Sequence, residues 1–224
     1  MTRVIRTGAY APKAIFFDFD GVLAESVAIK EQVFRELFLP YGDDIVEQVI
    51  RLHRELGAIS RVIKIERVHR DLLGRPLKQD ELAEWAERYA TTVEQQVVGC
   101  PEVPGTTALL ADQAARATLF VVSGTPEDEM RRIVHARGWD RYFAAVFGSP
   151  RLKPEIVRAA LAEHGLDAGD CLFVGDTFTD HDAAKATGMP FVGRRVDFRP
   201  NPFPPGTLIV EDMAELAGLL RAAA

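Results

Sequence analysis

The sequence predicts an α/β fold in which a parallel sheet is covered by helices and a smaller all-helical unit is inserted after the first strand. Short apolar runs alternate with helical stretches along most of the chain, and this alternation is typical of βαβ units with parallel strands. One segment breaks the alternation, because it contains successive helical patterns and no strand pattern. With 224 residues, 47% of them hydrophobic, the chain is long enough for one domain with an insertion.

The first strand is predicted at Ala14–Asp18, a run of apolar and aromatic residues preceded by Pro12. Continuous runs of this kind are typical of central strands buried on both faces. Further strands are predicted at Ala117–Ser123, Ala144–Gly148, Cys171–Asp176, Pro190–Gly193 and Thr207–Val210. Helices are predicted between them, near Thr106–Ala115, Pro126–Arg137, Pro154–Glu163 and Asp180–Thr187.

Residues 25–99 are expected to form the inserted helical unit, which we call the cap. The α/β core then comprises residues 1–24 and 100–224, with hinges near Val22–Glu25 and Gly99–Pro104. Residues 194–206 contain four prolines, which lack backbone donors, so this segment is predicted to be a loop, here called the proline-rich loop.

Composition excludes several classes of protein. The net charge of −6 and the lack of a basic run argue against binding to nucleic acid or to a membrane surface through bulk charge. No apolar stretch approaches the length of a membrane span, and the first residues do not read as a signal peptide. Two cysteines are too few for a disulfide framework. A cytoplasmic protein is the resulting expectation.

Four aspartates lie at or just after the ends of two of the predicted strands. Asp18 ends the first predicted strand and Asp20 follows it, and Asp176 ends the strand that begins at Cys171 and Asp180 follows it. The carboxyl ends of parallel strands are where such sheets bind ligands. Asp20 could also serve only as a turn residue before Gly21, and Asp180 only as a favourable charge at a helix start. Gathered together, however, the four carboxylates would require a hard cation such as Mg²⁺.

Two further segments carry groups suited to a phosphate. Ser123 and Gly124 end a predicted strand and offer a hydroxyl and an unobstructed backbone N–H. Lys153 follows the next strand and supplies a compact positive charge. Each is weak evidence alone, since Ser-Gly is ordinary turn chemistry and a lone lysine is usually solvated.

The order of these motifs resembles the haloacid dehalogenase (HAD) superfamily of phosphohydrolases. The pattern DxDG, helical insertion, Ser at a strand end, Lys-Pro and GDxxxD runs from about Ala14 to Gly193. The segments DGVLAES and VGDTFTDHDAAKATGMPFVG are similar to the phosphoglycolate phosphatase-like branch with a helical cap. The resemblance implies a Rossmann-like parallel sheet and a Mg²⁺-dependent phosphatase acting on a small phosphorylated metabolite.

The resemblance also implies a role for each residue. Asp18 would be the nucleophile that forms an aspartyl-phosphate, and Asp20 the general acid and base. Ser123, Gly124 and Lys153 would hold the phosphoryl oxygens. The metal site would comprise Asp18, Asp20 through its carbonyl, Asp176 and Asp180, with Asp180 more a support of the metal shell or of Lys153 than a direct ligand.

In caps of this type, the turn between the second and third helices approaches the active site. Here that turn leads into Ser60, Arg61 and Lys64, which share the first turns of a predicted helix. A helix N-terminus with two cations suits a carboxylate or second phosphate of the substrate. The alternative is a capped surface helix with solvated charges.

Two other functions compete with a phosphatase acting on phosphoglycolate or a sugar phosphate. A phosphomutase of the β-phosphoglucomutase kind uses the same aspartyl-phosphate but returns the phosphoryl group to sugar. A non-catalytic protein that binds a phosphorylated metabolite is the second alternative, which the complete set of acidic residues and lysine disfavours. A monomer or a homodimer is expected.

Overall fold

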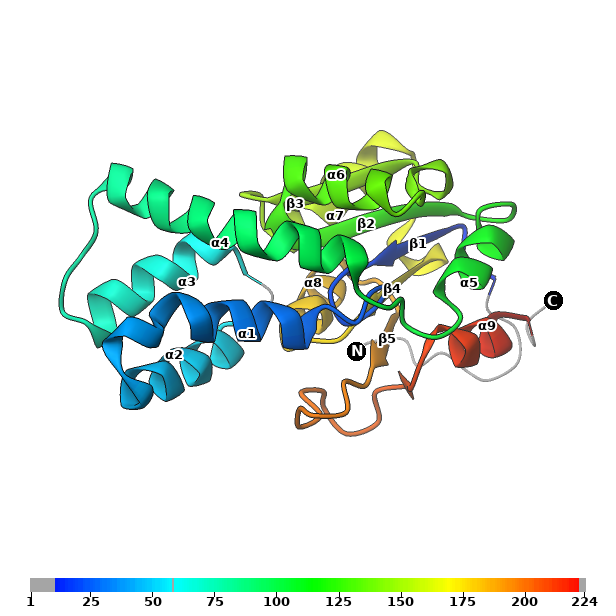
Figure 1. Cartoon of the computed structure of the whole chain (residues 1–224). Helices are drawn as coiled ribbons and strands as arrows, with labels where there is room; N and C mark the ends of the chain where they lie inside the picture. Colours follow the sequence, from blue (N-terminus) through cyan, green and yellow to red (C-terminus); the bar gives the residue numbers. More distant parts are fainter. Residues whose placement is uncertain (1–10, 58, 222–224) are drawn as a thin grey trace.

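The computed structural model describes residues 11–57 and 59–221. Six strands in this part of the chain form one parallel sheet in the order β3-β2-β1-β4-β5-β6 (Figure 1). The strands are β1 (Ala14–Phe17), β2 (Thr118–Pro126), β3 (Ala145–Ser149), β4 (Cys171–Gly175), β5 (Phe191–Arg194) and β6 (Ile209–Val210). The predicted α/β fold is therefore confirmed, and each predicted apolar run overlaps one strand.

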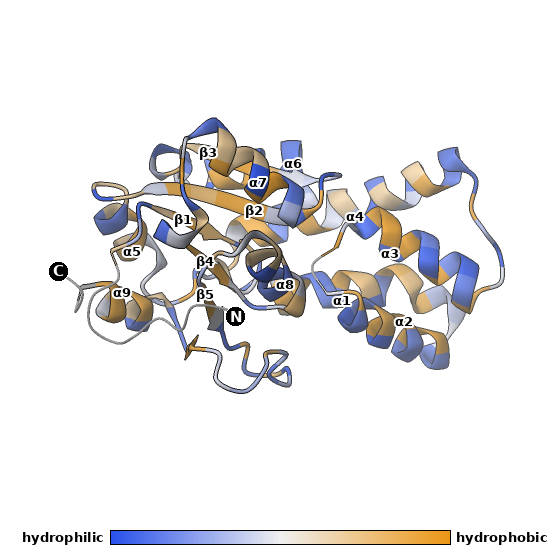
Figure 2. Ribbon diagram, turned by 180° about the vertical axis from the view of Figure 1, so that it is seen from behind, coloured by the Kyte–Doolittle hydropathy of each residue, from blue (hydrophilic) through white to orange (hydrophobic). Residues whose placement is uncertain are grey.

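Strand β1 lies at the centre of the sheet, between β2 and β4. All four of its residues are buried, as the uninterrupted apolar run predicts. Because side chains alternate along a strand, Ile15 and Phe17 join the apolar cluster on one face and Ala14 and Phe16 join the cluster on the other. Figure 2 shows this hydrophobic centre as orange strands.

Helices cover both faces of the sheet. One face carries α5 (Thr106–Gln113), α6 (Glu127–Ala136) and α9 (Met213–Arg221), and the other carries α7 (Lys153–Glu163) and α8 (Phe178–Thr187) (Figure 1). Short 3₁₀ turns lie at Asp140–Tyr142 and Ala168–Asp170. The core is thus a three-layer sandwich whose carboxyl strand ends all meet at one edge.

The segment between β1 and α5 is helical and projects from that edge (Figure 1). It contains α1 (Val27–Phe38), a 3₁₀ turn (Leu39–Tyr41), α2 (Asp43–Glu55), α3 (Arg61–Arg67) with a π-helical continuation (Val68–Leu72), and α4 (Gln79–Gly99). Aromatic side chains join these helices, since the Phe34 ring centroid lies 4.7 Å from that of Tyr89 and 4.6 Å from that of His53.

The two chain connections between cap and core lie side by side. Ala24 forms an isolated β-bridge with Glu102, and the Glu25 N–H donates to the Pro101 carbonyl at 3.0 Å. Arg194 at the end of β5 donates to Glu25 at 2.5 Å and fastens this junction to the sheet. The division of the chain at residues 24 and 99 stays a prediction. None of the described helices combines the length and the apolar character that crossing a bilayer requires.

Candidate active site

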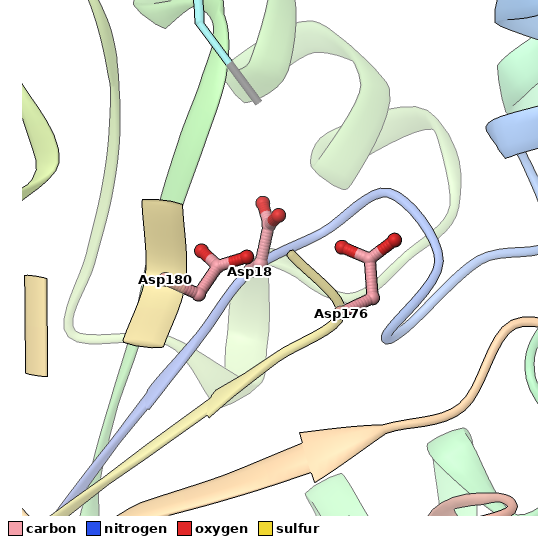
Figure 3. Close-up of side chains that lie close together, drawn as sticks. All are labelled: Asp18, Asp176 and Asp180. Carbon is pink, nitrogen blue, oxygen red and sulfur yellow. The ribbon is translucent and has the colours of Figure 1, made fainter. Parts of the chain in front are cut away.

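Three aspartates meet at the carboxyl edge of the sheet. Asp18 follows β1 and Asp176 follows β4, and these strands are neighbours in register, with Phe17 opposite Val174. Asp180 comes from the first turn of α8. One carboxylate oxygen from each of Asp18, Asp176 and Asp180 lies within 4.8 Å of the others, and all three residues are buried (Figure 3).

The turn after β1 requires a glycine next to this cluster. Gly21 has a φ of 75°, and a Cβ at this position would lie 2.6 Å from an Asp176 carboxylate oxygen and 2.7 Å from Val27. The Asp18 Oδ1 accepts a hydrogen bond from the Phe19 N–H at 2.7 Å, which orients the carboxylate. The Asp20-Gly21 pair therefore makes a turn, and Gly21 also leaves space for Asp176 after β4. A turn role and a place in the site are thus compatible.

Asp180 is held by the start of its own helix. Its Oδ2 accepts from the Thr177 backbone N–H at 3.0 Å and from the Thr177 hydroxyl at 2.6 Å, while its Oδ1 accepts from Lys153 Nζ at 2.5 Å. A Cβ at Gly175 would lie 2.2 Å from the Asp180 Cβ, so only glycine allows this approach. With both oxygens occupied, Asp180 is placed to orient Lys153, which supports the secondary role expected for it.

Lys153 begins α7 and is only 6% exposed. Its Nζ lies 2.9 Å from Asp18 Oδ2 and 2.5 Å from Asp180 Oδ1. Burial lowers the pKa of Lys153, but the two carboxylates outweigh burial and raise it. The lysine is therefore a fixed cation beside the predicted nucleophile, and not a solvated surface residue.

The acidic cluster carries more negative charge than its surroundings neutralise. Burial raises the pKa of Asp18 to about 7 against the lowering effect of Lys153. Burial, followed by the charges of Asp18 and Asp180, raises the pKa of Asp176. Asp176 Oδ1 is buried and has no hydrogen-bond partner among the described residues. An all-oxygen set with an unpaired buried oxygen and excess negative charge fits a hard divalent cation such as Mg²⁺.

Asp20 stands apart from this cluster. Its carboxylate accepts hydrogen bonds from the Ser26 hydroxyl at 2.6 Å and from Lys30 Nζ, and Lys30 also donates to the Thr125 hydroxyl at 2.7 Å. Burial alone would raise the pKa of Asp20, but the charge and hydrogen bond of Lys30 outweigh it and lower the pKa. The lowered pKa favours the ionised carboxylate, which contacts Ser26 and Lys30 at the start of the cap.

The carboxyl end of β2 contributes residues both to the cavity and to the core. Gly124 and Thr125 line a cavity with Asp18, Asp20 and Asp176. Ser123 is 1% exposed, and its Oγ accepts the Thr125 N–H at 3.1 Å. Gly124 thus reaches the site directly, and the predicted phosphoryl contact of the Ser123 hydroxyl stays a prediction.

The three cap residues predicted to bind substrate have different surroundings. Ser60 is the N-cap of α3, and its Oγ accepts the Val62 N–H at 3.3 Å. Arg61 and Lys64 both line the cavity and are both 6% exposed. Arg61, however, forms a buried ion pair with Glu129 of α6 at 2.5 Å. The alternative of a surface helix with solvated charges is therefore wrong, and Arg61 also ties the cap to the core.

Sequence reasoning missed several side chains that line this cavity, among them Lys30, Tyr89, Thr125 and Arg199. Lys30 lies in the first turn of α1, and Arg199 lies in the proline-rich loop. Thr125 follows the predicted Ser-Gly pair, so a wider reading of that motif would have found it. For Lys30 and Arg199 no local pattern marks the residue, because their positions depend on packing.

Comparison with known proteins identifies the family of this chain. A family model for haloacid dehalogenase-like hydrolases matches residues 12–188. The phosphoglycolate phosphatase of Rhodospirillum rubrum is 30% identical over 193 residues, which cover 81% of this chain and 78% of that protein. Protein CbbY (plasmid) of Cupriavidus necator is 28% identical over 213 residues, covering 88% and 84%.

Solved structures share the fold. A predicted phosphoglycolate phosphatase from Haemophilus somnus matches with a TM-score of 0.75 at 20% identity, covering 95% of this chain and 99% of the other. CbbY from Rhodobacter sphaeroides, in complex with phosphate, matches with a TM-score of 0.74 at 22% identity, covering 92% and 96%.

The chain belongs to the haloacid dehalogenase-like hydrolases. Its relatives include phosphoglycolate phosphatases and CbbY proteins, which confirms the predicted family, its phosphoglycolate phosphatase-like branch and the prediction of a phosphatase-type enzyme.

Proposed function

We propose that the protein is a Mg²⁺-dependent phosphatase that hydrolyses a small phosphomonoester, such as phosphoglycolate or a sugar phosphate, through an aspartyl-phosphate on Asp18. The observation that carries this proposal is the position of Asp18, at the end of the central strand. Its carboxylate lies 2.9 Å from Lys153 Nζ and within 4.8 Å of Asp176, and it lines the same cavity as Asp20. By this proposal, the enzyme acts in the cytoplasm.

The chemistry divides into two displacements at phosphorus. In the first, an Asp18 oxygen attacks phosphorus, the bond to the ester oxygen breaks, and Asp20 gives that oxygen a proton. In the second, water attacks the phosphoryl group on Asp18 while Asp20 accepts the proton, which releases phosphate and restores Asp18. Against the raising effect of burial, the contacts with Lys30 and Ser26 lower the pKa of Asp20 and favour its ionised form, which is the state needed for the second step. Asp20 must therefore take up a proton before the first.

The other residues reduce the electrostatic cost of bringing two anions together. Lys153 places a buried positive charge beside Asp18, and Asp180 fixes the direction of that lysine. Asp18 and Asp176, with the Asp20 carbonyl, would hold Mg²⁺, which when bound offsets the charge of the carboxylates and the phosphoryl group. Gly124 lines the cavity and would contribute a backbone N–H to the phosphoryl oxygens.

Turnover of p-nitrophenyl phosphate and of phosphoglycolate with Mg²⁺ tests the proposal, with Asp18→Asn as the critical variant. Wild type should release phosphate, and Asp18→Asn should be inactive. Asp182→Asn is the matched control, because Asp182 lies on α8 near the site but its side chain is 67% exposed. Acid-quenched wild type should show a phosphoryl-sized mass gain on the peptide that contains Asp18.

The same assays decide between the alternatives. Equal signals from wild type and Asp18→Asn would contradict the proposal and favour a non-catalytic binder. An isomerised sugar phosphate formed without phosphate release would favour a mutase. Neither alternative is favoured by a particular contact in the structure. Oligomeric state, monomer or homodimer, stays a prediction.

A further inference from the structure

The proline-rich loop brings an arginine into the active-site cavity. Arg199 lines the same cavity as Asp18 and Asp176, although it lies far from them in the sequence. The loop is anchored on the core by Phe203, whose ring contacts that of Phe191 with centroids 5.2 Å apart. The Arg199 N–H donates to the Val196 carbonyl at 3.0 Å, and the following proline restricts the arginine backbone. Arg199 is therefore presented by a fixed segment.

Two of the cations that line the cavity already have close carboxylate partners. Lys30 is paired with Asp20. Arg61 is paired with Glu129 at 2.5 Å, with both side chains almost fully buried. Lys153, just behind the cavity, is likewise paired with carboxylates. These cations are therefore committed to holding the site together or to the reacting phosphoryl group.

Lys64 and Arg199 are different. Lys64 is 6% exposed, and its nearest polar contact is His53 Nδ1 at 3.4 Å; no described carboxylate lies within 4.0 Å of its Nζ. Arg199 Nη2 lies 3.8 Å from Glu31, but Glu31 already binds Arg54 at 2.5 and 2.9 Å. The Arg199 Nε is buried without a hydrogen-bond partner in the described part of the chain.

A buried cation without a partner is costly, because its hydration is lost and nothing replaces it. One such group could be tolerated for folding reasons alone. Here Lys64 of cap helix α3 has no carboxylate partner among the described residues. Arg199 of the core loop is partly buried, shares Glu31 with Arg54 and leaves its buried Nε unpaired. Together, two under-neutralised cations in one cavity indicate a missing anion that bridges them. The reacting phosphoryl group is already provided for by Lys153 and the metal site, so this anion is a second group on the same small molecule.

We propose that Lys64 and Arg199 together bind a second anionic group of the substrate, a carboxylate or a second phosphate, and that Arg199 makes the proline-rich loop a specificity-determining element. The inference rests on the proposed phosphatase function and narrows its substrate class. The enzyme prefers small phosphate esters with a second negative group to neutral esters. Lys64 recognises that group from the cap and Arg199 from the core, so both parts of the chain contribute to selection.

The test compares kcat/KM for phosphoglycolate, for a sugar bisphosphate and for p-nitrophenyl phosphate at saturating Mg²⁺. The readout is the ratio between each doubly anionic ester and the nitrophenyl ester, which separates selection from chemistry. Arg199→Ala should lower this ratio about tenfold or more, mainly through KM, as expected for loss of a charge-assisted contact. Arg199→Lys should retain part of the wild-type preference for the doubly anionic esters. The carboxylate and bisphosphate arms show which second group the site prefers.

Arg195→Ala is the matched control. Arg195 belongs to the same loop, but its side chain is 54% exposed and pairs with Glu211 outside the cavity. This variant should keep the wild-type ratio. Lys64→Ala should lower the ratio as Arg199→Ala does, and the double variant should lose less than the product of the two single losses, because both side chains bind one group.

Three results would overturn the inference. Arg199→Ala could reduce turnover of all three esters equally, which would mean that the arginine acts on the acidic cluster. Arg195→Ala could change the ratio as much as Arg199→Ala. The wild type could hydrolyse all three esters without preference. A wild type that hydrolyses none of them would instead contradict the proposed function, so the two failures are distinguishable. Should Arg199→Ala fail to fold, Arg199→Lys and Lys64→Ala carry the same comparison.

Discussion

Addition of Mg²⁺ should raise the free energy of unfolding of the protein much more at about pH 8 than at about pH 5. Burial raises the pKa of Asp18 from 3.8 to about 7 in the folded chain. Between pH 3.8 and about pH 7, the metal-free folded state therefore binds more protons than the unfolded state. Its free energy of unfolding falls as the pH rises through this range. Each pH unit corresponds to about 1.4 kcal/mol. Asp18 thus costs the metal-free protein about 4 kcal/mol once it is fully ionised.

A bound divalent cation offsets that cost, because it stabilises the ionised carboxylates. About 3 kcal/mol of the cost develops between pH 5 and pH 8, so Mg²⁺ should add about 3 kcal/mol more at the higher pH. For a chain of this size, that difference corresponds to a change of about 6–12 °C in Tm. Comparing samples with Mg²⁺ and with EDTA at each pH cancels the titration of groups that the metal does not touch.

Thermal unfolding followed by circular dichroism gives the Tm in each of four conditions, with Mg²⁺ or with EDTA at each of the two pH values. Asp176→Asn should lose most of the Mg²⁺ effect, since Asp176 supplies the unpaired buried oxygen. Asp182→Asn, whose side chain is 67% exposed, should keep it. An equal Mg²⁺ effect at both pH values, or an effect that survives in Asp176→Asn, would refute the charge argument for the metal site.

Three further predictions address the surrounding cations. Glu129→Gln should cost about 3–5 kcal/mol in urea unfolding, because Arg61 is left buried without its partner; a loss below about 1 kcal/mol would contradict this. Lys30→Met should lower kcat about tenfold or more, because Asp20 loses the contact that holds its carboxylate. Lys30→Arg should retain part of the wild-type kcat. A raised KM at unchanged kcat would contradict the role of Lys30 in positioning Asp20. Burial, then two neighbouring cations, lowers the pKa of Lys64 to about 7. The folded chain therefore loses this charge above pH 7, and KM for phosphoglycolate should rise there in wild type but not in Lys64→Arg.

The strands and the acidic cluster could be predicted because both depend on local patterns and one topological rule. Buried parallel strands need continuous apolar runs, which the sequence shows from Ala14 and from Cys171. Parallel strands place their carboxyl ends at one edge. The proximity of Asp18 and Asp176 could therefore be predicted without knowledge of side-chain packing. Lys153 follows the same rule, since it begins the helix after β3.

The neighbours of Asp20 could not be predicted in this way. Lys30 contacts Asp20 when α1 is oriented with Phe34 against Tyr89 of α4. That orientation of α1 depends on how the cap helices pack. Arg61 offers a similar case, because its ion pair with Glu129 joins segments that are 68 residues apart. The last strand was also predicted longer, as Thr207–Val210, than the observed β6 (Ile209–Val210). Backbone pairing with β5 covers only Gly193 and Arg194, so a longer partner is not supported.

The α/β class, the helical insertion and the order of the acidic and basic motifs could be predicted from periodicity and from the residues at strand ends. Which cations are neutralised, and which lack a carboxylate partner in the cavity, depends on how the cap packs against the core. The reason is physical: the charge state and reach of Lys64 or Arg199 depend on burial and on carboxylates contributed by distant segments. No local pattern encodes those distances, and they emerge only when the cap packs against the core.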